Sequence, residues 1–199
     1  MIDKIKFGTD GWRAIIAKDF TVNNVARVAE ATAEWLLKKS KNAIVVLGYD
    51  CRFGGKLFCE TIAKILCSRG IKVYHAENFV STPMISLGTV NYKADIGIII
   101  TASHNPPDYN GFKLKGSYGG PLLPDQVSEI ESLIPDETTF SNLETYSLAS
   151  LDMKTSLDCF VFVIIPGNLI KTGFILKLKS LLRSCRASPI RIPLDKSVK

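Results

Sequence analysis

Short apolar blocks alternate along the first 150 residues with segments whose apolar positions recur at helical spacing. The β-branched blocks predict strands, and the periodic segments between them predict helices. Strands and helices that alternate with short connections are typical of an α/β domain. We therefore predict a three-layer α/β/α domain with a mainly parallel mixed sheet. The expected strands are 12–16, 43–47, 71–75, 95–101 and 112–115, and the expected helices are 21–39, 56–68, a short one from 82 and 124–133.

Individual residues predict where several of these elements begin and end. Thr21 is a good N-cap for the first helix, and Gly70 suits the end of the second. Pro83 is well placed at the first position of the third helix. Asn110-Gly111 is a strong turn signal, so the strand that follows it should return from a tight turn there.

The pattern changes after about residue 150. Residues 1–150 hold 16 basic and 16 acidic residues, whereas residues 151–199 hold nine basic and three acidic ones and so carry the whole net charge of +6. Periodicity is lost there, and Phe160–Ile165 is a charge-free apolar run. We expect residues 1–150 to form one domain and residues 151–199 to be an irregular basic tail from an altered reading frame or a truncated second domain. The basic charge then says nothing about the partners of the main domain, and we expect no nucleic-acid partner.

Composition limits the class of protein further. An apolar fraction of 46% and a charged fraction of 22% are ordinary for a globular chain. No apolar stretch reaches the roughly 18 residues that cross a membrane, and no secretory signal pattern is visible. Five cysteines are odd in number and show no C-x-x-C spacing. These features favour a cytoplasmic protein without a disulfide framework or a zinc site.

The segment richest in chemistry is Thr101–Pro106, with the sequence Thr-Ala-Ser-His-Asn-Pro, directly after an apolar strand. Pro106 and Pro107 disfavour helical backbone in the residues before them, so the loop should be extended and stiff. Ser103 would then stand at the end of the strand, where open α/β sheets bind ligands. Adjacent residues on extended backbone point to opposite sides, which disfavours a Ser103–His104 general-base pair. By itself, the segment is equally consistent with an ordinary polar loop.

Three further segments lie at or beside predicted strand ends, namely Phe7–Arg13, Gly48–Gly55 and Ser81–Pro83. All could line one crevice with the first segment, and arginines in such loops suit bidentate binding of phosphate. A simpler interpretation of Arg52 is that it pairs with Asp50 or caps a helix. The glycine spacing differs from that of a P-loop, and no G-x-G-x-x-G fingerprint is present.

Together these motifs resemble those of the α-D-phosphohexomutases, the family that includes phosphoglucomutase and phosphomannomutase. The resemblance covers residues 1 to about 150 and implies the family's first α/β/α domain. The matching motifs are Phe7-Gly-Thr-Asp-Gly-Trp-Arg13, Gly48-Tyr-Asp-x-Arg-Phe-Gly-Gly55, Ser81-Thr-Pro-Met84, Thr101–Pro106 and Asn110-Gly-Phe-Lys113.

The resemblance also implies roles for single residues. Ser103 would be the serine that is phosphorylated in the resting enzyme and exchanges its phosphoryl group with a hexose 1- or 6-phosphate through a bisphosphate intermediate. Arg13 and Lys113 would act beside the reacting phosphate, Lys113 as a general acid or base. Mg²⁺ would be held through the phosphate on Ser103, and a hexose 1,6-bisphosphate would be the activator. Substrate contacts would come from His104, Asn105 and Thr101.

The chain departs from the family pattern in its last part. No Asp-x-Asp-x-Asp metal loop occurs in the sequence, and residues 156–199 do not match the family's second domain. We expect negligible mutase turnover from this chain alone, because Ser103 would lack the cation that offsets charge in the transition state. One alternative is a non-catalytic module whose basic tail binds an acidic partner or a membrane surface. Another is a serine hydrolase using Ser103 and His104, against which the absence of a G-x-S-x-G elbow weighs.

Overall fold

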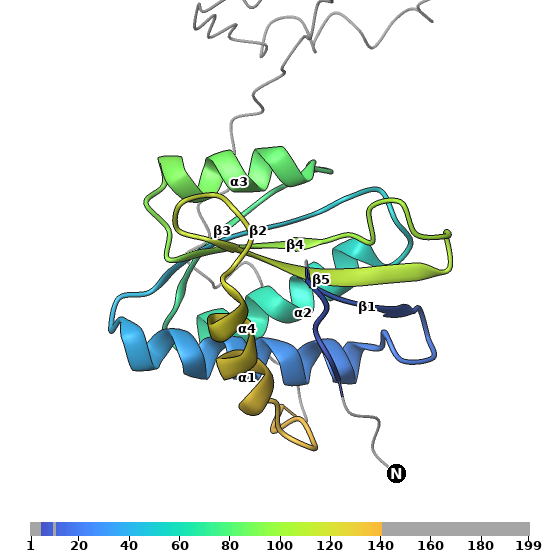
Figure 1. Ribbon diagram of the computed structural model, residues 1–199, viewed down its shortest axis with the longest axis horizontal. Coiled ribbons are helices and arrows are strands. Elements are labelled where there is room, and N and C mark those ends of the chain that lie inside the picture. The colour runs from blue at the N-terminus through green and yellow to red at the C-terminus, as the bar shows by residue number, and fades with distance from the viewer. Residues whose placement is uncertain (1–4, 10, 141–199) are drawn as a thin grey trace, which may run out of the picture. The chain divides into compact units, whose positions relative to one another are not determined.

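The computed structural model of the chain describes residues 5–9 and 11–140. Within these residues, five strands form one sheet in the order β1-β5-β4-β2-β3, and four helices accompany it (Figure 1). The strands are β1 (Trp12–Ile15), β2 (Ile44–Tyr49), β3 (Lys72–His75), β4 (Ile96–Ile100) and β5 (Tyr109–Gly116). The helices are α1 (Val22–Lys39), α2 (Gly55–Ser68), α3 (Thr82–Asn91) and α4 (Pro124–Ser132).

The sheet has a parallel half and an antiparallel half. β2 pairs in parallel with both β3 and β4, whereas β5 is antiparallel to both β4 and β1. α3 covers one face of the sheet, and α1, α2 and α4 cover the other (Figure 1). This arrangement confirms the predicted α/β fold with three layers and a mixed sheet.

Strand β4 separates two apolar clusters. Ile96, Ile98 and Ile100 belong to the larger cluster, which includes α1 and α2, while Ile99 belongs to the smaller cluster with Ile85 of α3. Alternate residues of a strand point to opposite faces, so both faces of β4 are covered. Burial on both sides explains its uninterrupted apolar sequence. Each such side chain contributes about 1.5–3 kcal/mol when it is fully buried.

The predicted helix ends are confirmed at two positions, and the third differs by one residue. The hydroxyl of Thr21 accepts a hydrogen bond from Asn24 N at 3.2 Å and so caps α1. Gly70 follows α2 with a φ of 77°, a left-handed conformation that glycine adopts without strain. α3 begins at Thr82, so Pro83 occupies its second position and not the first. Its missing N–H still costs no hydrogen bond within the helix, because N–H groups of the first turn have no helical acceptor.

The prediction of a tight turn at Asn110-Gly111 is wrong. Both residues lie inside β5, which begins at Tyr109. A Cβ atom on Gly111 would come within 2.7 Å of Thr101 O and 2.9 Å of Trp12 O. Glycine is therefore needed here because three strands pack closely, and the chain reverses earlier, in the loop before β5.

The predicted domain boundary at residue 150 and the predicted basic tail lie outside the described residues. The last described segment is held against α1: Arg27 Nε donates to Pro135 O at 2.6 Å, and Thr139 N donates to Glu30 Oε1 at 3.1 Å. In the described part of the chain, no helix is long and apolar enough to cross a membrane.

Candidate active site

The candidate site forms where the carboxyl ends of β2 and β4 lie next to each other. The two strands are parallel, with Tyr49 opposite Ile100, so the loops that follow them start side by side. We call residues 50–54 the supporting loop and residues 101–108 the reactive loop. The first residue of the reactive loop, Thr101, donates its hydroxyl hydrogen to the carboxylate of Asp50 in the supporting loop.

Ser103 is exposed in the reactive loop and has a φ of 53°. The extended backbone predicted for this loop is therefore wrong at Ser103, because left-handed backbone is uncommon for a residue other than glycine. Its N–H donates to Thr101 Oγ1 at 3.0 Å, and its carbonyl accepts from Arg52 Nη2 at 2.9 Å. An unfavourable conformation of this kind persists where the surrounding contacts fix it.

Lys113 approaches the Ser103 hydroxyl from the sheet. Its Nζ donates to Ser103 Oγ at 2.9 Å, although only 3% of the lysine is exposed. Gly11, with a φ of 106°, lets the N-terminal segment lie against this lysine, since a Cβ there would be 3.0 Å from Lys113 Cγ. A cation in such a partly desolvated place interacts more strongly with an anion than it would in water. The pair can therefore bind and stabilise a phosphoryl group on Ser103.

Arg13 lies close to the same place through strand pairing. It stands on β1 directly opposite Gly111 of β5. Gly111 in turn precedes Lys113 by two residues on the same strand. Paired residues share a face of the sheet, as do residues two apart on one strand. Arg13 and Lys113 thus lie on one face, and a Cβ on Gly111 would be 3.0 Å from Arg13 Cγ. The structure brings together two of the cations that the sequence singled out.

Arg52 binds the reactive loop with its guanidinium group. Its side-chain Nε lies 3.8 Å from Asp50 Oδ2, and its backbone N–H donates to Asp50 Oδ1 at 2.9 Å. The simpler interpretation, that this arginine is a partner of Asp50, is therefore confirmed. The guanidinium also donates four hydrogen bonds to backbone carbonyl groups. The acceptors are Pro106 O (2.7 Å) and Tyr109 O (2.9 Å) for Nη1, and Ser103 O (2.9 Å) and Asn105 O (2.6 Å) for Nη2.

The three residues expected to contact substrate differ in their surroundings. His104 is exposed beside Ser103. Thr101 is only 3% exposed, and its hydroxyl already bonds with Asp50 and Ser103 N. The side-chain oxygen of Asn105 is buried and has no hydrogen-bond partner among the described residues. Such an acceptor costs free energy until a donor from a ligand or water reaches it.

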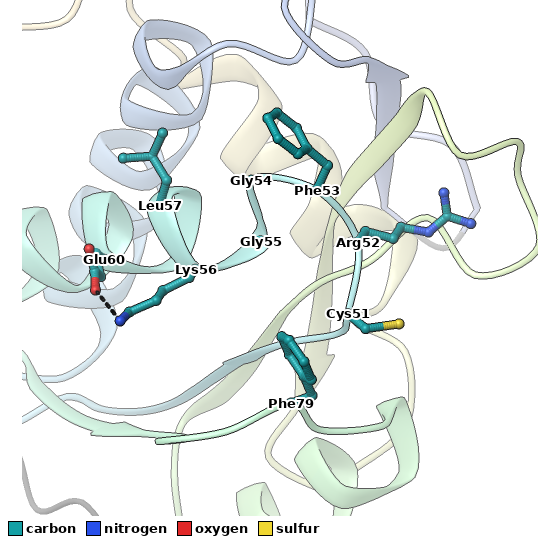
Figure 2. A pocket seen from close by; sticks show the side chains of 9 residues that line it. All are labelled: Cys51, Arg52, Phe53, Gly54, Gly55, Lys56, Leu57, Glu60 and Phe79. Atoms are coloured by element: carbon teal, nitrogen blue, oxygen red, sulfur yellow. Dashed lines mark ion pairs between the residues drawn. The ribbon is translucent and has the colours of Figure 1, made fainter.

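A pocket of about 520 Å³ adjoins the supporting loop (Figure 2). Phe53 and Phe79 line it and are 80% and 63% exposed. Ser103 is not among its lining residues. Figure 2 shows the Arg52 side chain leaving the pocket, and its hydrogen bonds place its end on the reactive loop. The pocket therefore does not include the exposed serine, whose carbonyl group accepts a hydrogen bond from the end of this arginine.

The described residues do not form a metal site by themselves. Among residues 5–9 and 11–140, no group of three His, Cys, Asp or Glu side chains is placed to hold a metal ion. The carboxylate of the supporting loop, Asp50, already accepts hydrogen bonds from Thr101 and from Arg52 N. Oxygen ligands for Mg²⁺ would have to include groups other than these side chains.

The fold and the motifs place the chain in a known family. The family model of phosphoglucomutase/phosphomannomutase, alpha/beta/alpha domain I, matches residues 4–140. The chain therefore belongs to this family of sugar-phosphate mutases, and the described residues correspond to domain I.

Individual relatives agree with this assignment. A phosphoglucomutase of Staphylococcus saprophyticus is 34% identical over 143 residues, which are 70% of this chain and 26% of that protein. A phosphoglucosamine mutase of Pelotomaculum thermopropionicum is 35% identical over 133 residues, 67% of this chain and 30% of that protein. The crystal structure of a putative phosphomannomutase from Thermus thermophilus matches with a TM-score of 0.68 and 39% identity, over 69% of this chain and 31% of that one. The chain thus spans about a quarter to a third of the length of these relatives.

Proposed function

We propose that this chain supplies the phosphoryl-carrying serine of a hexose-phosphate mutase. Ser103 would exchange a phosphoryl group with a hexose 1- or 6-phosphate through a hexose bisphosphate. The observation that carries the proposal is the 2.9 Å contact between the buried ammonium of Lys113 and the exposed hydroxyl of Ser103. The names of the relatives refer to glucose, glucosamine and mannose, so the proposal concerns hexose phosphates as a class.

In the proposed step, Ser103 Oγ attacks the phosphorus atom of the bisphosphate. The bond from Oγ to phosphorus forms while the bond from phosphorus to the sugar oxygen breaks. The hydroxyl proton of Ser103 passes to that sugar oxygen, with Lys113 as the relaying acid and base. Phosphoryl transfer depends mainly on positioning and on neutralising charge, which a buried ammonium next to the attacking oxygen provides.

Other residues would bind the substrate or support the serine. Arg13, on the same sheet face as Lys113, would bind phosphate oxygens. His104, exposed beside Ser103, would contact the sugar phosphate, and a donor from the substrate would satisfy the buried oxygen of Asn105. We assign Thr101 to the support of Ser103, since its hydroxyl is already bonded to the serine N–H.

Mg²⁺ would neutralise charge on the transferring group, and we propose that, among residues 5–9 and 11–140, only the phosphate on Ser103 would bind it. Because no Asp-x-Asp-x-Asp segment occurs in the sequence, we expect slow loading of Ser103 and negligible mutase turnover by this chain alone. The domain of residues 1–150 and the cytoplasmic location remain predictions from the sequence.

The test is transfer of labelled phosphate from hexose 1,6-bisphosphate to the purified chain in the presence of Mg²⁺. We expect slow, stoichiometric labelling of the wild-type chain and none of the Ser103→Ala variant. Ser81→Ala is the matched control, because Ser81 is also an exposed serine after a strand and caps α3 without a side-chain hydrogen bond. Equal labelling of Ser103→Ala and the wild type would contradict the proposal.

A further inference from the structure

The supporting loop contains a residue whose contacts reach the whole reactive loop. The four hydrogen bonds of Arg52 go to carbonyl groups spread from Ser103 to Tyr109. A planar guanidinium with five fixed donors suits such a set of acceptors, whereas an ammonium does not. The acceptors are backbone groups, so these contacts fix the path of the loop whatever side chains it carries.

Ser103 is the residue most affected by these contacts. Its carbonyl accepts from Arg52, and its N–H donates to Thr101, which in turn donates to Asp50. Both backbone polar groups of the serine are therefore tied to the supporting loop, one directly and one through Thr101. These ties act on a residue with a φ of 53°, which would relax toward common backbone conformations without them.

The direction of the Ser103 hydroxyl depends on this backbone conformation. Lys113 Nζ, held by β5, is 2.9 Å from Ser103 Oγ only while the loop keeps its present path. A shift of about 1 Å at a reacting group can cost about 100-fold in rate.

We propose that Arg52 is a positioning residue for Ser103, which holds the serine backbone in the left-handed conformation that aims its hydroxyl at Lys113. This inference rests on the proposed function of Ser103 as the phosphoryl acceptor. In this proposal Arg52 acts through the loop and not by contact with the substrate. Its side chain is 14% exposed, and its guanidinium donors bind the loop.

The first measurement is backbone hydrogen exchange, which requires no activity. Arg52→Ala should speed the exchange of the Ser103, Asn105 and Tyr109 amides while amides in the core strands stay protected. Lys56→Gln is the matched control, since Lys56 lines the same pocket, pairs with Glu60 at 3.8 Å and is 71% exposed. Arg52→Lys is the second variant, in case the alanine variant does not fold. If a folded Arg52 variant exchanges these loop amides at the wild-type rate, the proposal is overturned.

The second measurement is the rate of phosphate uptake by Ser103 at increasing concentrations of hexose 1,6-bisphosphate. Arg52→Ala should lower the maximal rate by up to about 100-fold and leave the half-saturating concentration unchanged. Added guanidinium ion, far below denaturing concentrations, should restore part of the rate, which a general loss of stability would not allow. A raised half-saturating concentration with an unchanged maximal rate would instead make Arg52 a substrate-binding residue and overturn the proposal.

The two measurements separate this proposal from the proposed function. If the wild-type chain takes up no phosphate, the proposed function fails, and hydrogen exchange alone still decides whether Arg52 holds the loop. If the wild type is phosphorylated and Arg52→Ala behaves like Lys56→Gln in both measurements, only the positioning role is wrong.

Discussion

The reactive loop and the supporting loop follow neighbouring parallel strands but use their polar side chains in opposite ways. Ser103 and His104 of the reactive loop are exposed, whereas Asp50 and Arg52 of the supporting loop form hydrogen bonds with the other loop. One loop presents the exposed hydroxyl of Ser103, and the other fixes its position. An exposed serine in an uncommon backbone conformation thus depends on polar residues that lie far away in the sequence.

The largest effect should come from the cation beside the serine. Lys113→Met keeps an unbranched side chain in the sheet but removes the ammonium 2.9 Å from Ser103 Oγ. Loss of a preorganised charge at the reacting group should slow phosphate uptake by about 100- to 1000-fold. Lys115→Met is the control, because Lys115 is also buried in β5 but lies opposite Gly97, at the other end of β4. Equal losses in both variants, measured by labelling, would contradict a special role for Lys113.

The next effect concerns β5, the strand that follows the reactive loop and pairs with β1. Gly111→Ala would place a Cβ within 2.7 Å of Thr101 O, a backbone atom that cannot move away alone. Overpacking of this kind should lower the free energy of unfolding by about 1–3 kcal/mol. Gly8→Ala is the control, since among the described residues a Cβ there would meet only Gly11 O, at 3.6 Å. Urea denaturation measures both variants, and equal stability of the two would show that the strands adapt.

A smaller effect, at Asp50, should distinguish a residue that supports the candidate site from one that only stabilises the fold. Asp50→Asn weakens the acceptor for Thr101 and for Arg52 N, which should lower the free energy of unfolding by about 1 kcal/mol and also slow phosphate uptake. Asp95→Asn is the matched variant, because Asp95 Oδ2 accepts from Ile44 N at 2.7 Å, at the opposite end of the sheet. It should cost similar stability and leave phosphate uptake unchanged. Slower uptake in both variants would mean that stability alone explains the loss.

The smallest effect concerns His75, at the end of β3. Burial, together with the nearby Lys56 ammonium, lowers the pKa of this histidine below 6.5. Below about pH 6.5 the unfolded chain therefore binds a proton that the folded chain does not, so stability should fall as the pH falls through this range. His75→Gln should make the urea midpoint less dependent on pH between about 7 and 5. An unchanged pH dependence would show that His75 is not the group responsible.

The sequence predicts the elements well where one local pattern determines them. The sequence predicts strand β4 because its five residues are apolar and either β-branched or glycine. It predicts helix α1 because Thr21 caps an amphipathic segment. β2 extends to Tyr49, two residues beyond its predicted end, because Gly48 and Tyr49 pair with β4. That extension depends on a partner strand, which no local pattern contains.

The candidate site was only partly predictable for the same reason. Ser103 and Lys113 stand out by their motifs, and their contact follows from the pairing of β4 with β5. The reach of Arg52 to carbonyl groups more than 50 residues away depends on β2 and β4 being parallel neighbours. The left-handed φ of Ser103 also has no sequence signal, since it is not a glycine.

Peptide mass spectrometry of the chain after incubation with hexose 1,6-bisphosphate and Mg²⁺ shows directly which residue takes up phosphate. We expect one phosphate, on Ser103, with the peptides that contain Ser81 and Ser117 unmodified. We also expect Arg52→Ala to carry less phosphate on Ser103 than Lys56→Gln after the same short incubation. A phosphate on a different residue, or none on Ser103, would show that Ser103 is not the phosphoryl acceptor.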